Sequence, residues 1–242
     1  MTIVPLFRVD THPTQAQACA GCSVRGLSLF GALDDAGLNR IRAQIANVEL
    51  QPGKTLFEAG ARGRALYTLR SGIVRFERVT ERGDRRIVRL AGRGDLIGQE
   101  VLLRRAYADD AVACTAAQLC SIPVHVVDEL SAHNPALVHE LMRRWQRALE
   151  DSEGWLSDLA TGPARRRMLR LLHKLAEHAG PGEPIWLPQR DEIGAMLDLT
   201  VETASRLVSR LRREGVLELM GARQARVDVT ALQQALRHED AR

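Results

Sequence analysis

Hydrophobic residues follow two different periods along this chain, and the change falls near Pro123. From about Leu50 to Ile122, short alternating or β-branched runs are separated by glycine-containing turns. Several short strands with turn signals between them predict an antiparallel sandwich or a barrel-like roll. The stretch TERGDRR, residues 80–86, predicts a hairpin turn in which Gly83 adopts a positive φ.

After Pro123 the pattern is helical. Apolar residues recur at steps of four and three along residues 137–159, which predicts one long helix with a narrow apolar stripe. Such a stripe is typical of a coiled-coil seam between two chains, although a helix packed on its own domain gives the same pattern. The predicted dimer-interface positions, with a polar residue in the one gap, are Val138, Met142, Trp145, Leu149, Ser152, Leu156 and Leu159.

The polar residue in this stripe, Ser152, lies among acids in the sequence EDSEG, residues 150–154. In a homodimer each acid would lie near its own copy, and like charges destabilise association. We therefore hypothesise that the seam is weak enough for dimerisation to be controlled. The next sequence, TGPARR (161–166), predicts a break and a new helix, with Thr161 as its cap and Pro163 in its first turn.

The segment PQRDEIGAMLDLTVETASRLVSRLRREG, residues 188–215, predicts two helices joined by a short turn. In the first, Gly194 permits close approach of the second, and Thr200 caps the second. The apolar face of the second helix comprises Val201, Ala204, Leu207, Val208 and Leu211. The predicted DNA-binding residues, from its cap, first turns and polar side, are Thr200, Glu202, Thr203, Ser205, Arg206, Ser209 and Arg213.

This pair of helices predicts a helix-turn-helix. An α-helix fits the major groove of DNA, where arginine can donate to guanine and glutamate can accept from cytosine. The sequence that follows, GVLELMGARQARVDV, predicts two short strands joined through Gly221, which would form a wing. A surface helix with a solvated charged face is the alternative interpretation. Dense arginine in residues 164–170 and 206–213 favours DNA binding.

Composition narrows the class of protein further. A hydrophobic content of 45% and a charged content of 26% are ordinary for a globular protein, and 4% aromatic residues argue against a stacking platform for single-stranded nucleic acid. No apolar run approaches the roughly 18 residues of a membrane span, and the N-terminal residues lack a signal-peptide pattern. We therefore expect a cytoplasmic protein. Neither a nucleophile with a base nor a phosphate loop is recognisable, so we expect no enzyme.

The order of a β-roll, a long helix and a winged helix resembles the CRP/FNR family of bacterial transcription regulators over nearly the whole chain. The sequence LTVETASRL resembles the FNR branch, whose recognition helix carries Glu-x-x-Ser-Arg, here Glu202, Ser205 and Arg206. The resemblance implies an α+β fold with an N-terminal antiparallel β-roll of the cyclic-nucleotide-binding type. The expected divisions are an N-terminal cysteine-bearing segment (1–29), a β-roll sensor domain (30–130), a dimerisation helix (131–160) and a winged helix-turn-helix DNA-binding domain (161–242).

The same resemblance implies what the protein binds. The expected target is double-stranded DNA with a two-fold site of the type TTGAT-N4-ATCAA, bound by a homodimer in which Arg206 reads guanine. An exposed turn on the β-roll contacts RNA polymerase in this family, as an activator requires. Gly83 and Asp84 are the candidate residues for that contact here.

Cyclic AMP is not expected as the signal. Cyclic AMP-binding members carry a glutamate and an Arg-Ser pair in the segment that matches residues 98–113. In this chain Gln99 stands in the glutamate position, and Asp109 and Asp110 stand in the Arg-Ser positions. Two carboxylates would repel a phosphate.

The FNR branch instead holds an oxygen-labile 4Fe–4S cluster on three N-terminal cysteines and one distant cysteine. Cys19, Cys22 and Cys120 match three of these positions, whereas Ser28 stands where the remaining cysteine is expected. Cys114 and Cys120 flank TAAQL, which can form a hairpin loop. As neighbours they would let Cys114 complete four thiolates, or would form a disulfide.

We therefore expect control by oxygen, redox state or nitric oxide through an iron–sulfur cluster on these cysteines. One alternative is a cluster-free thiol–disulfide switch that uses the same residues. A second alternative is a sensor of haem or another small ligand. Its conceivable haem ligands are His12, His125, His133 and His139.

Overall fold

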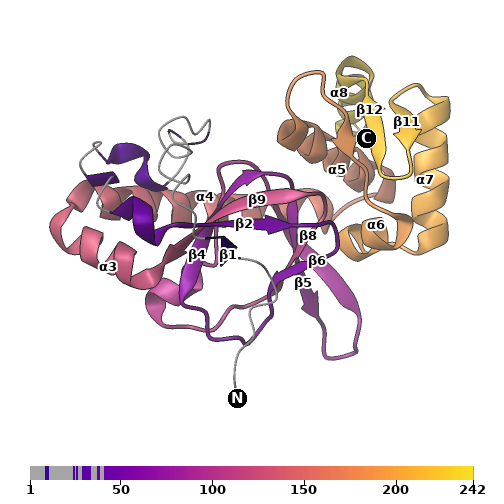
Figure 1. The fold of residues 1–242 in the computed structure, drawn as a ribbon. Coiled ribbons are helices and arrows are strands. Elements are labelled where there is room, and N and C mark those ends of the chain that lie inside the picture. Colours follow the sequence, from indigo (N-terminus) through magenta and orange to yellow (C-terminus); the bar gives the residue numbers. More distant parts are fainter. Residues whose placement is uncertain are drawn as a thin grey trace. The chain divides into compact units, whose positions relative to one another are not determined.

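The computed structural model describes residues 9–10, 24, 26, 29–33, 37–38 and 41–241 (Figure 1). The chain divides into two compact units. One contains residues up to Arg78 together with Arg89–Leu149, and the other contains Val79–Val88 together with Glu150–Arg242.

The first unit contains the antiparallel β-roll that the sequence predicts, apart from the hairpin residues Val79–Val88, which belong to the second unit. Within the described residues, one sheet has the strand order β1-β2-β9-β4-β7 and the other has the order β3-β8-β5-β6. The strands are β1 (Val9–Asp10), β2 (Ala46–Leu50), β3 (Thr55–Phe57), β4 (Ala65–Ser71), β5 (Val74–Val79), β6 (Arg85–Ala91), β7 (Leu96–Ile97), β8 (Asp110–Ala113) and β9 (Ala117–Pro123). The turn between β5 and β6 contains Gly83 at φ 84°, as expected.

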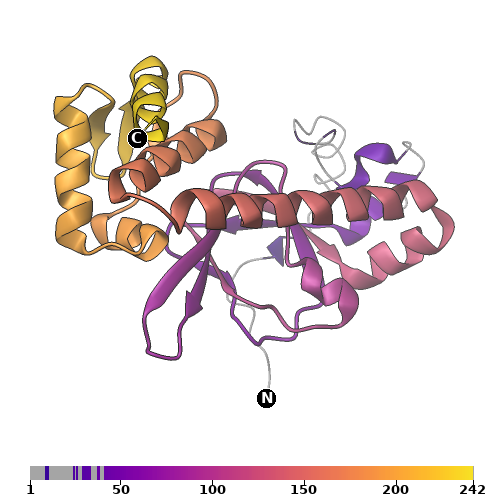
Figure 2. The ribbon, with the colours of Figure 1, turned by 180° about the vertical axis from the view of Figure 1, so that it is seen from behind.

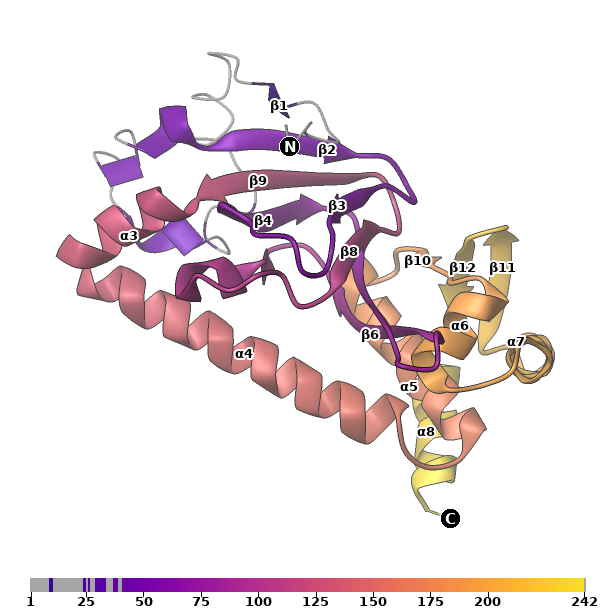
Figure 3. The same ribbon diagram turned by 90° about the horizontal axis from the view of Figure 1, so that it is seen from below.

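The five-stranded sheet has a clear interior face because side chains alternate along each strand. Val48 on β2 and Leu69 on β4 both pair with Leu119 on β9, and all three are fully buried. Figure 3 shows β2, β9 and β4 side by side. Removal of these side chains from water stabilises the roll.

Two helices follow the roll, α3 (Val124–His133) and α4 (Pro135–Leu159). Figure 2 shows α4 as one long, uninterrupted helix, which confirms the helical pattern of residues 137–159. Within the first unit, Arg144 of α4 is buried and its Nη1 donates to the carbonyl of Gly94 at 3.0 Å. Its Nε lies 2.9 Å from Glu140, one turn earlier.

Short 3-10 helices are η2 (Leu29–Ala32), η3 (Arg42–Gln44) and η4 (Gln99–Leu103).

The second unit contains the predicted helix-turn-helix and wing. Its elements are α5 (Ala164–Ala179), β10 (Ile185–Trp186), α6 (Arg190–Leu197), α7 (Val201–Arg213), β11 (Leu217–Gly221), β12 (Gln224–Val227) and α8 (Val229–Asp240). The two predicted wing strands, β11 and β12, pair antiparallel, and β10 adds a further strand beside β12. Buried Met168, Leu172 and Ile193 contribute to the core of this unit.

The expected cap of α5 is wrong in one respect. The residue before the helix is Pro163, with no side-chain cap hydrogen bond. The hydroxyl of Thr161 instead donates to the carbonyl of Ser157 at 2.8 Å. Thr161 therefore satisfies a carbonyl in the last turn of α4, a position where backbone acceptors lack helical partners.

Candidate DNA-binding surface and sensor residues

The helix-turn-helix is built from α6, a left-handed turn and α7. Asp198 follows the last residue of α6 at φ 54°, a left-handed conformation that aspartate tolerates better than most residues. A Cβ placed on Gly194 would lie 2.5 Å from the carbonyl oxygen of Leu199. The close approach that the sequence predicts at Gly194 is therefore to the backbone of the turn, and not to the second helix.

The start of α7 is fixed as predicted by Thr200, whose hydroxyl accepts a hydrogen bond from the amide of Thr203 at 3.3 Å. Ala204, Val208 and Leu211 are buried and seat the helix on its unit. Val201 is 49% exposed, which corrects its assignment to the apolar face. It lies in the first turn, where the helix extends beyond the core.

The polar side of α7 is open to solvent. Glu202, Ser205, Arg206 and Arg213 are exposed, while Thr203 and Ser209 are half-buried. Figure 3 looks along α7 and shows it at the edge of its unit, next to α6.

The charges of this helix suit contacts with bases. Hydrogen bonding to its own backbone amide, and then to the Thr200 hydroxyl, holds the pKa of Glu202 below its usual value, and Arg206 lowers it further. Glu202 is therefore an acceptor at neutral pH. Nη2 of Arg206 donates to the hydroxyl of Thr203 at 3.4 Å, which guides the guanidinium along the first turns of α7.

The far end of α7 is held by a network of ion pairs. Arg165 of α5 lies 2.7 Å from Glu214, just beyond α7, and 2.6 Å from Glu239 of α8. Arg210 reaches the other oxygen of Glu214 at 2.8 Å. Sequence reasoning missed this network, because its members come from three helices far apart in the chain.

The stripe predicted on α4 is exposed for most of its length. Val138, Met142, Trp145, Leu149 and Leu156 are among the exposed large hydrophobic residues, and Ser152 is exposed in the gap between them. Leu159 is fully buried within its own chain, so its assignment to the dimer interface is wrong. At this position the helix enters the core of the second unit.

The two N-terminal cysteines, Cys19 and Cys22, lie outside the described residues, as do Ser28 and His12. Cys120 is half-buried on β9, in register with Asn47 of β2 and Thr68 of β4. These residues share the face of the sheet opposite to Leu119. The hydroxyl of Thr68 is buried there and has no hydrogen-bond partner among the residues that the structure describes.

Cys114 lies elsewhere. It is 3% exposed and follows β8, a strand of the four-stranded sheet, whereas β9 belongs to the five-stranded sheet. The expectation that Cys114 and Cys120 lie opposite each other in a hairpin is therefore wrong. Residues 114–116 carry the chain from one sheet to the other. In the described part of the chain, no three His, Cys, Asp or Glu residues are grouped so that they could hold a metal ion.

The candidate haem ligands that the structure describes have local roles or lie on the surface. His125 lies 2.9 Å from the side-chain oxygen of Gln44, and His133 lies 3.3 Å from the carbonyl of Glu129 one turn earlier. His139 is exposed on α4.

The residues that stand at the expected cyclic-nucleotide contact positions are buried or make contacts within the protein. Asp109 pairs with Arg78 at 2.7 Å, and Asp110 accepts from the amide of Ala59 at 2.7 Å. Gln99 is buried. Both carboxylates that would repel a phosphate are therefore held by contacts within the roll.

The candidate polymerase-contacting residues lie at the tip of the hairpin between β5 and β6. The amide of Gly83 donates to the carbonyl of Thr80 at 2.9 Å, and the amide of Asp84 donates to the Thr80 hydroxyl at 3.2 Å. Both Gly83 and Asp84 are exposed.

An exposed recognition helix, a wing and a β-roll together define a DNA-binding transcription regulator of the helix-turn-helix class. Two family matches agree with this assignment: the cyclic nucleotide-binding domain matches residues 47–134, and the Crp-like helix-turn-helix domain matches residues 166–235.

Comparison with characterised proteins identifies the family. The fumarate and nitrate reduction regulatory protein of Vibrio cholerae serotype O1 is 30% identical over 209 residues, 84% of each chain. The regulatory protein HlyX of Actinobacillus pleuropneumoniae is 27% identical over 209 residues, 84% of this chain and 87% of its own. The structure of FixK2 from Bradyrhizobium japonicum shares the fold, with a TM-score of 0.72 at 22% identity over 82% of this chain and 98% of its own. The chain belongs to the CRP/FNR family of transcription regulators.

The relatives and the fold are those of transcription regulators and not of enzymes. Across the described residues, none of the helices is both long and apolar enough to cross a membrane.

Proposed function

We propose that this regulator binds a two-fold DNA site of the type TTGAT-N4-ATCAA. Arg206 reads guanine, and Glu202 accepts a hydrogen bond from a base in the same groove. The observation that carries the proposal is the exposed set Glu202, Ser205 and Arg206 on the first turns of α7. A bidentate Arg–guanine contact discriminates by about 1–3 kcal/mol against the wrong base.

The test is fluorescence anisotropy with duplexes that carry either the intact palindrome or a palindrome with the guanine replaced in both halves. Arg206→Ala should weaken binding to the intact site by at least about tenfold and abolish the preference between the two duplexes. Arg237→Ala, on exposed α8 surface, is the charge-matched control and should retain the preference. An Arg206→Ala variant that still prefers the intact duplex would refute the reading role.

We propose that the exposed stripe of α4 forms the dimer interface with a second copy of the chain. Met142 and Leu156 are 64% and 65% exposed in the single chain, and burial against a copy would remove that apolar surface from water. Glu150, Asp151 and Glu153 around Ser152 oppose the association.

Sedimentation of the full-length protein tests this interface. Ser152→Leu should shift the monomer–dimer equilibrium toward the dimer, and Met142→Glu should shift it toward the monomer. An unchanged equilibrium constant in Ser152→Leu would show that the acidic gap does not control association.

We propose that Cys19, Cys22 and Cys120 are thiolate ligands of a 4Fe–4S cluster. Oxygen or nitric oxide destroys such a cluster, so the cluster would be the group that senses them. The support is the cysteine spacing, the half-buried position of Cys120 and the buried hydroxyl of Thr68 beside it, which has no hydrogen-bond partner in the described part of the chain. These ligands would tie the N-terminal segment to β9 and thereby favour the dimeric form. Because Cys114 is buried at the end of a strand in the other sheet, we assign the fourth position to a ligand other than Cys114.

Iron and sulfide analysis of protein purified without oxygen tests this assignment. Cys19→Ala and Cys120→Ala should lose iron and the visible absorbance, whereas Cys114→Ala should retain both. Absence of iron and of visible absorbance in the unmutated protein would refute the cluster and leave a thiol–disulfide switch.

We also propose that the turn with Gly83 and Asp84 contacts RNA polymerase. Its exposure and its fixed backbone support this role. Asp84→Ala should reduce transcription in a purified system without changing DNA affinity, and equal losses of both would contradict the proposal.

A further inference from the structure

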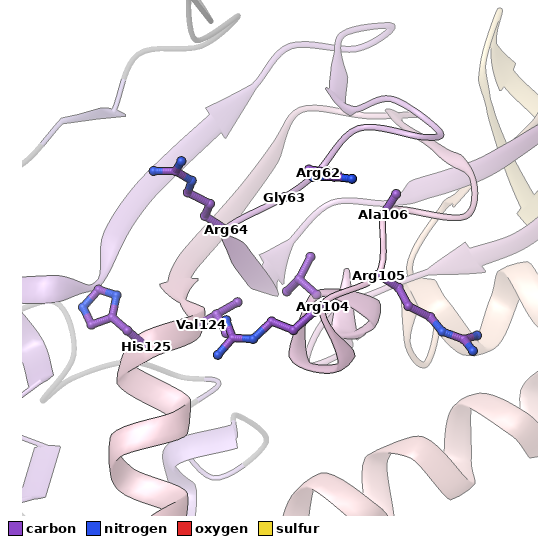
Figure 4. Close-up of a pocket in the computed structure, with 9 residues that line it drawn as sticks. Arg62, Gly63, Arg64, Arg104, Arg105, Ala106, Val124 and His125 are labelled. Carbon is purple, nitrogen blue, oxygen red and sulfur yellow. The ribbon is translucent and has the colours of Figure 1, made fainter.

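The first unit contains a pocket that none of the roles above uses. It has a volume of about 710 Å³ and lies between the loop before β4, the chain just after η4 and the start of α3 (Figure 4). Its lining residues are Arg62, Gly63, Arg64, Val101, Arg104, Arg105, Ala106, Val124 and His125. Gln99, Asp109 and Asp110, at the positions of the family's nucleotide contacts, do not line it.

The charge of this pocket is strongly positive. Four of the nine lining residues are arginines and none is acidic. Asp128 on α3 pairs with one of these arginines, Arg104, at 2.6 Å. Arg62, Arg64 and Arg105 are exposed and have no carboxylate partner among the described residues. Like charges gathered around one concavity repel one another unless an anion lies between them.

The backbone that carries these arginines is fixed. A Cβ on Gly63 would lie 2.1 Å from the Tyr107 ring, so the loop lies directly on that ring. Tyr107 stacks on Phe57 with 3.8 Å between ring centroids, and its hydroxyl donates to the carbonyl of Ala65 at 2.7 Å. Arg104 adopts a left-handed conformation at φ 57°, which is uncommon for a residue other than glycine.

The side chains leave room for a ligand. In Figure 4, Arg104 extends toward Val124 and His125, while Arg64 and Arg105 come from separate segments and extend away from one another, so both exposed side chains must turn inward to contact one ligand. Guanidinium groups recognise phosphate through paired N–H donors. Because these arginines come from two segments, linked phosphate groups can contact more of them than a single phosphate group can. Val101 and Val124 add an apolar part to the lining.

We propose that this pocket binds a small oligophosphate, a molecule with two or more linked phosphate groups. Arg62, Arg64 and Arg105 contact the phosphates, and Arg104 exchanges its pairing with Asp128 for the ligand. The site is independent of both the DNA-binding helix and the proposed cluster.

Isothermal titration of the full-length protein with inorganic pyrophosphate, and separately with orthophosphate, tests this site. Pyrophosphate should bind saturably and at least about tenfold more tightly than orthophosphate. The double variant Arg64→Gln/Arg105→Gln should weaken pyrophosphate binding by at least about tenfold. Both side chains are exposed, so this variant should fold normally.

The matched control is Lys54→Gln/Arg237→Gln, which removes the same charge from exposed positions away from the pocket. It should leave pyrophosphate affinity within about twofold, because a specific site does not depend on net charge alone. Equal weakening in the two double variants would overturn the proposal, as would the absence of saturable binding. Because the readout uses neither DNA nor iron, its failure is separable from failure of the proposed function.

Discussion

Arg223, in the turn of the wing, donates through Nη2 to both carboxylate oxygens of Glu192, at 2.8 and 2.6 Å. Glu192 is the third residue of α6 and is 4% exposed. The same carboxylate accepts from the backbone amide of Gln189 at 2.6 Å and so completes a capping box at the start of α6. One buried acid therefore fixes both the first helix of the helix-turn-helix and the wing.

Glu192→Gln should loosen both elements. The amide carries no charge for Arg223, so we expect the second unit to lose about 2 kcal/mol of stability. Amides in β11, β12 and α6 should exchange hydrogen faster. Glu218→Gln is the control, because Glu218 pairs with Arg226 at 3.4 Å on the exposed face of the same wing. Equal exchange in the two variants would contradict the role of Glu192.

Arg144→Ala should destabilise the first unit. The change leaves the Gly94 carbonyl without its buried donor and removes one of the two arginines that pair with Glu140, the other being Arg143. Breaking a buried pair of this kind costs about 3 kcal/mol. The urea midpoint of the full-length protein should fall, whereas Arg147→Ala, on the exposed part of the same helix, should leave it nearly unchanged. Equal midpoints in the two variants would show that the contact with Gly94 is dispensable.

Gly194→Ala should damage the helix-turn-helix even though alanine favours helices. The added Cβ would meet the Leu199 carbonyl at 2.5 Å, and the turn must shift to relieve it. We expect a loss of about 2 kcal/mol in stability and weaker DNA binding in anisotropy measurements. Gly221→Ala meets nothing within 4 Å and serves as the control. A Gly194→Ala variant with unchanged DNA affinity would contradict the prediction.

Acid should weaken the anchoring of α7. Burial alone would raise the pKa of Glu214, but hydrogen bonds from Arg165 and Arg210 hold it below its ordinary value. A carboxyl whose folded-state pKa is lowered stabilises fully above the unfolded-state pKa of about 4.3, and this contribution disappears as pH falls through the folded-state value.

Urea midpoints of the unmutated protein and of Glu214→Gln should therefore differ at pH 7 and converge as the pH falls below about 4. Glu177→Gln, at an exposed position on α5, should not reproduce this behaviour. A difference that stays constant with pH would rule out titration of Glu214 as the cause.

Much of the fold was predictable because local signals agree with tertiary structure. Alternation predicted the roll, the helical period predicted α4, and Thr200 was recognised as the cap of α7. The positive φ of Gly83 was also predicted correctly, since glycine is the residue that adopts this conformation most readily.

The errors arise where several local solutions are equally good. Residues 114–116 are short enough for a hairpin, yet they cross between sheets, and only the pairing of β9 with β2 and β4 decides the matter. Leu159 continues the α4 period but lies in a core that begins there. The arginine pocket joins segments near residues 62, 104 and 124, so no single stretch of sequence displays it.

The helix α4 runs without interruption from Pro135 to Leu159, while the boundary between the two compact units falls within it, between Leu149 and Glu150. A genetic crossover placed in the acidic stretch that follows would join one parent's sensor to another parent's DNA reader, and only the hairpin residues Val79–Val88 of the second unit would come from the sensor parent. The helical frame of the junction would be kept as long as no residue were gained or lost. Exchange of inputs and targets among relatives through this one recombination point therefore requires only that the hairpin of the sensor parent fit the DNA-binding unit of the other parent.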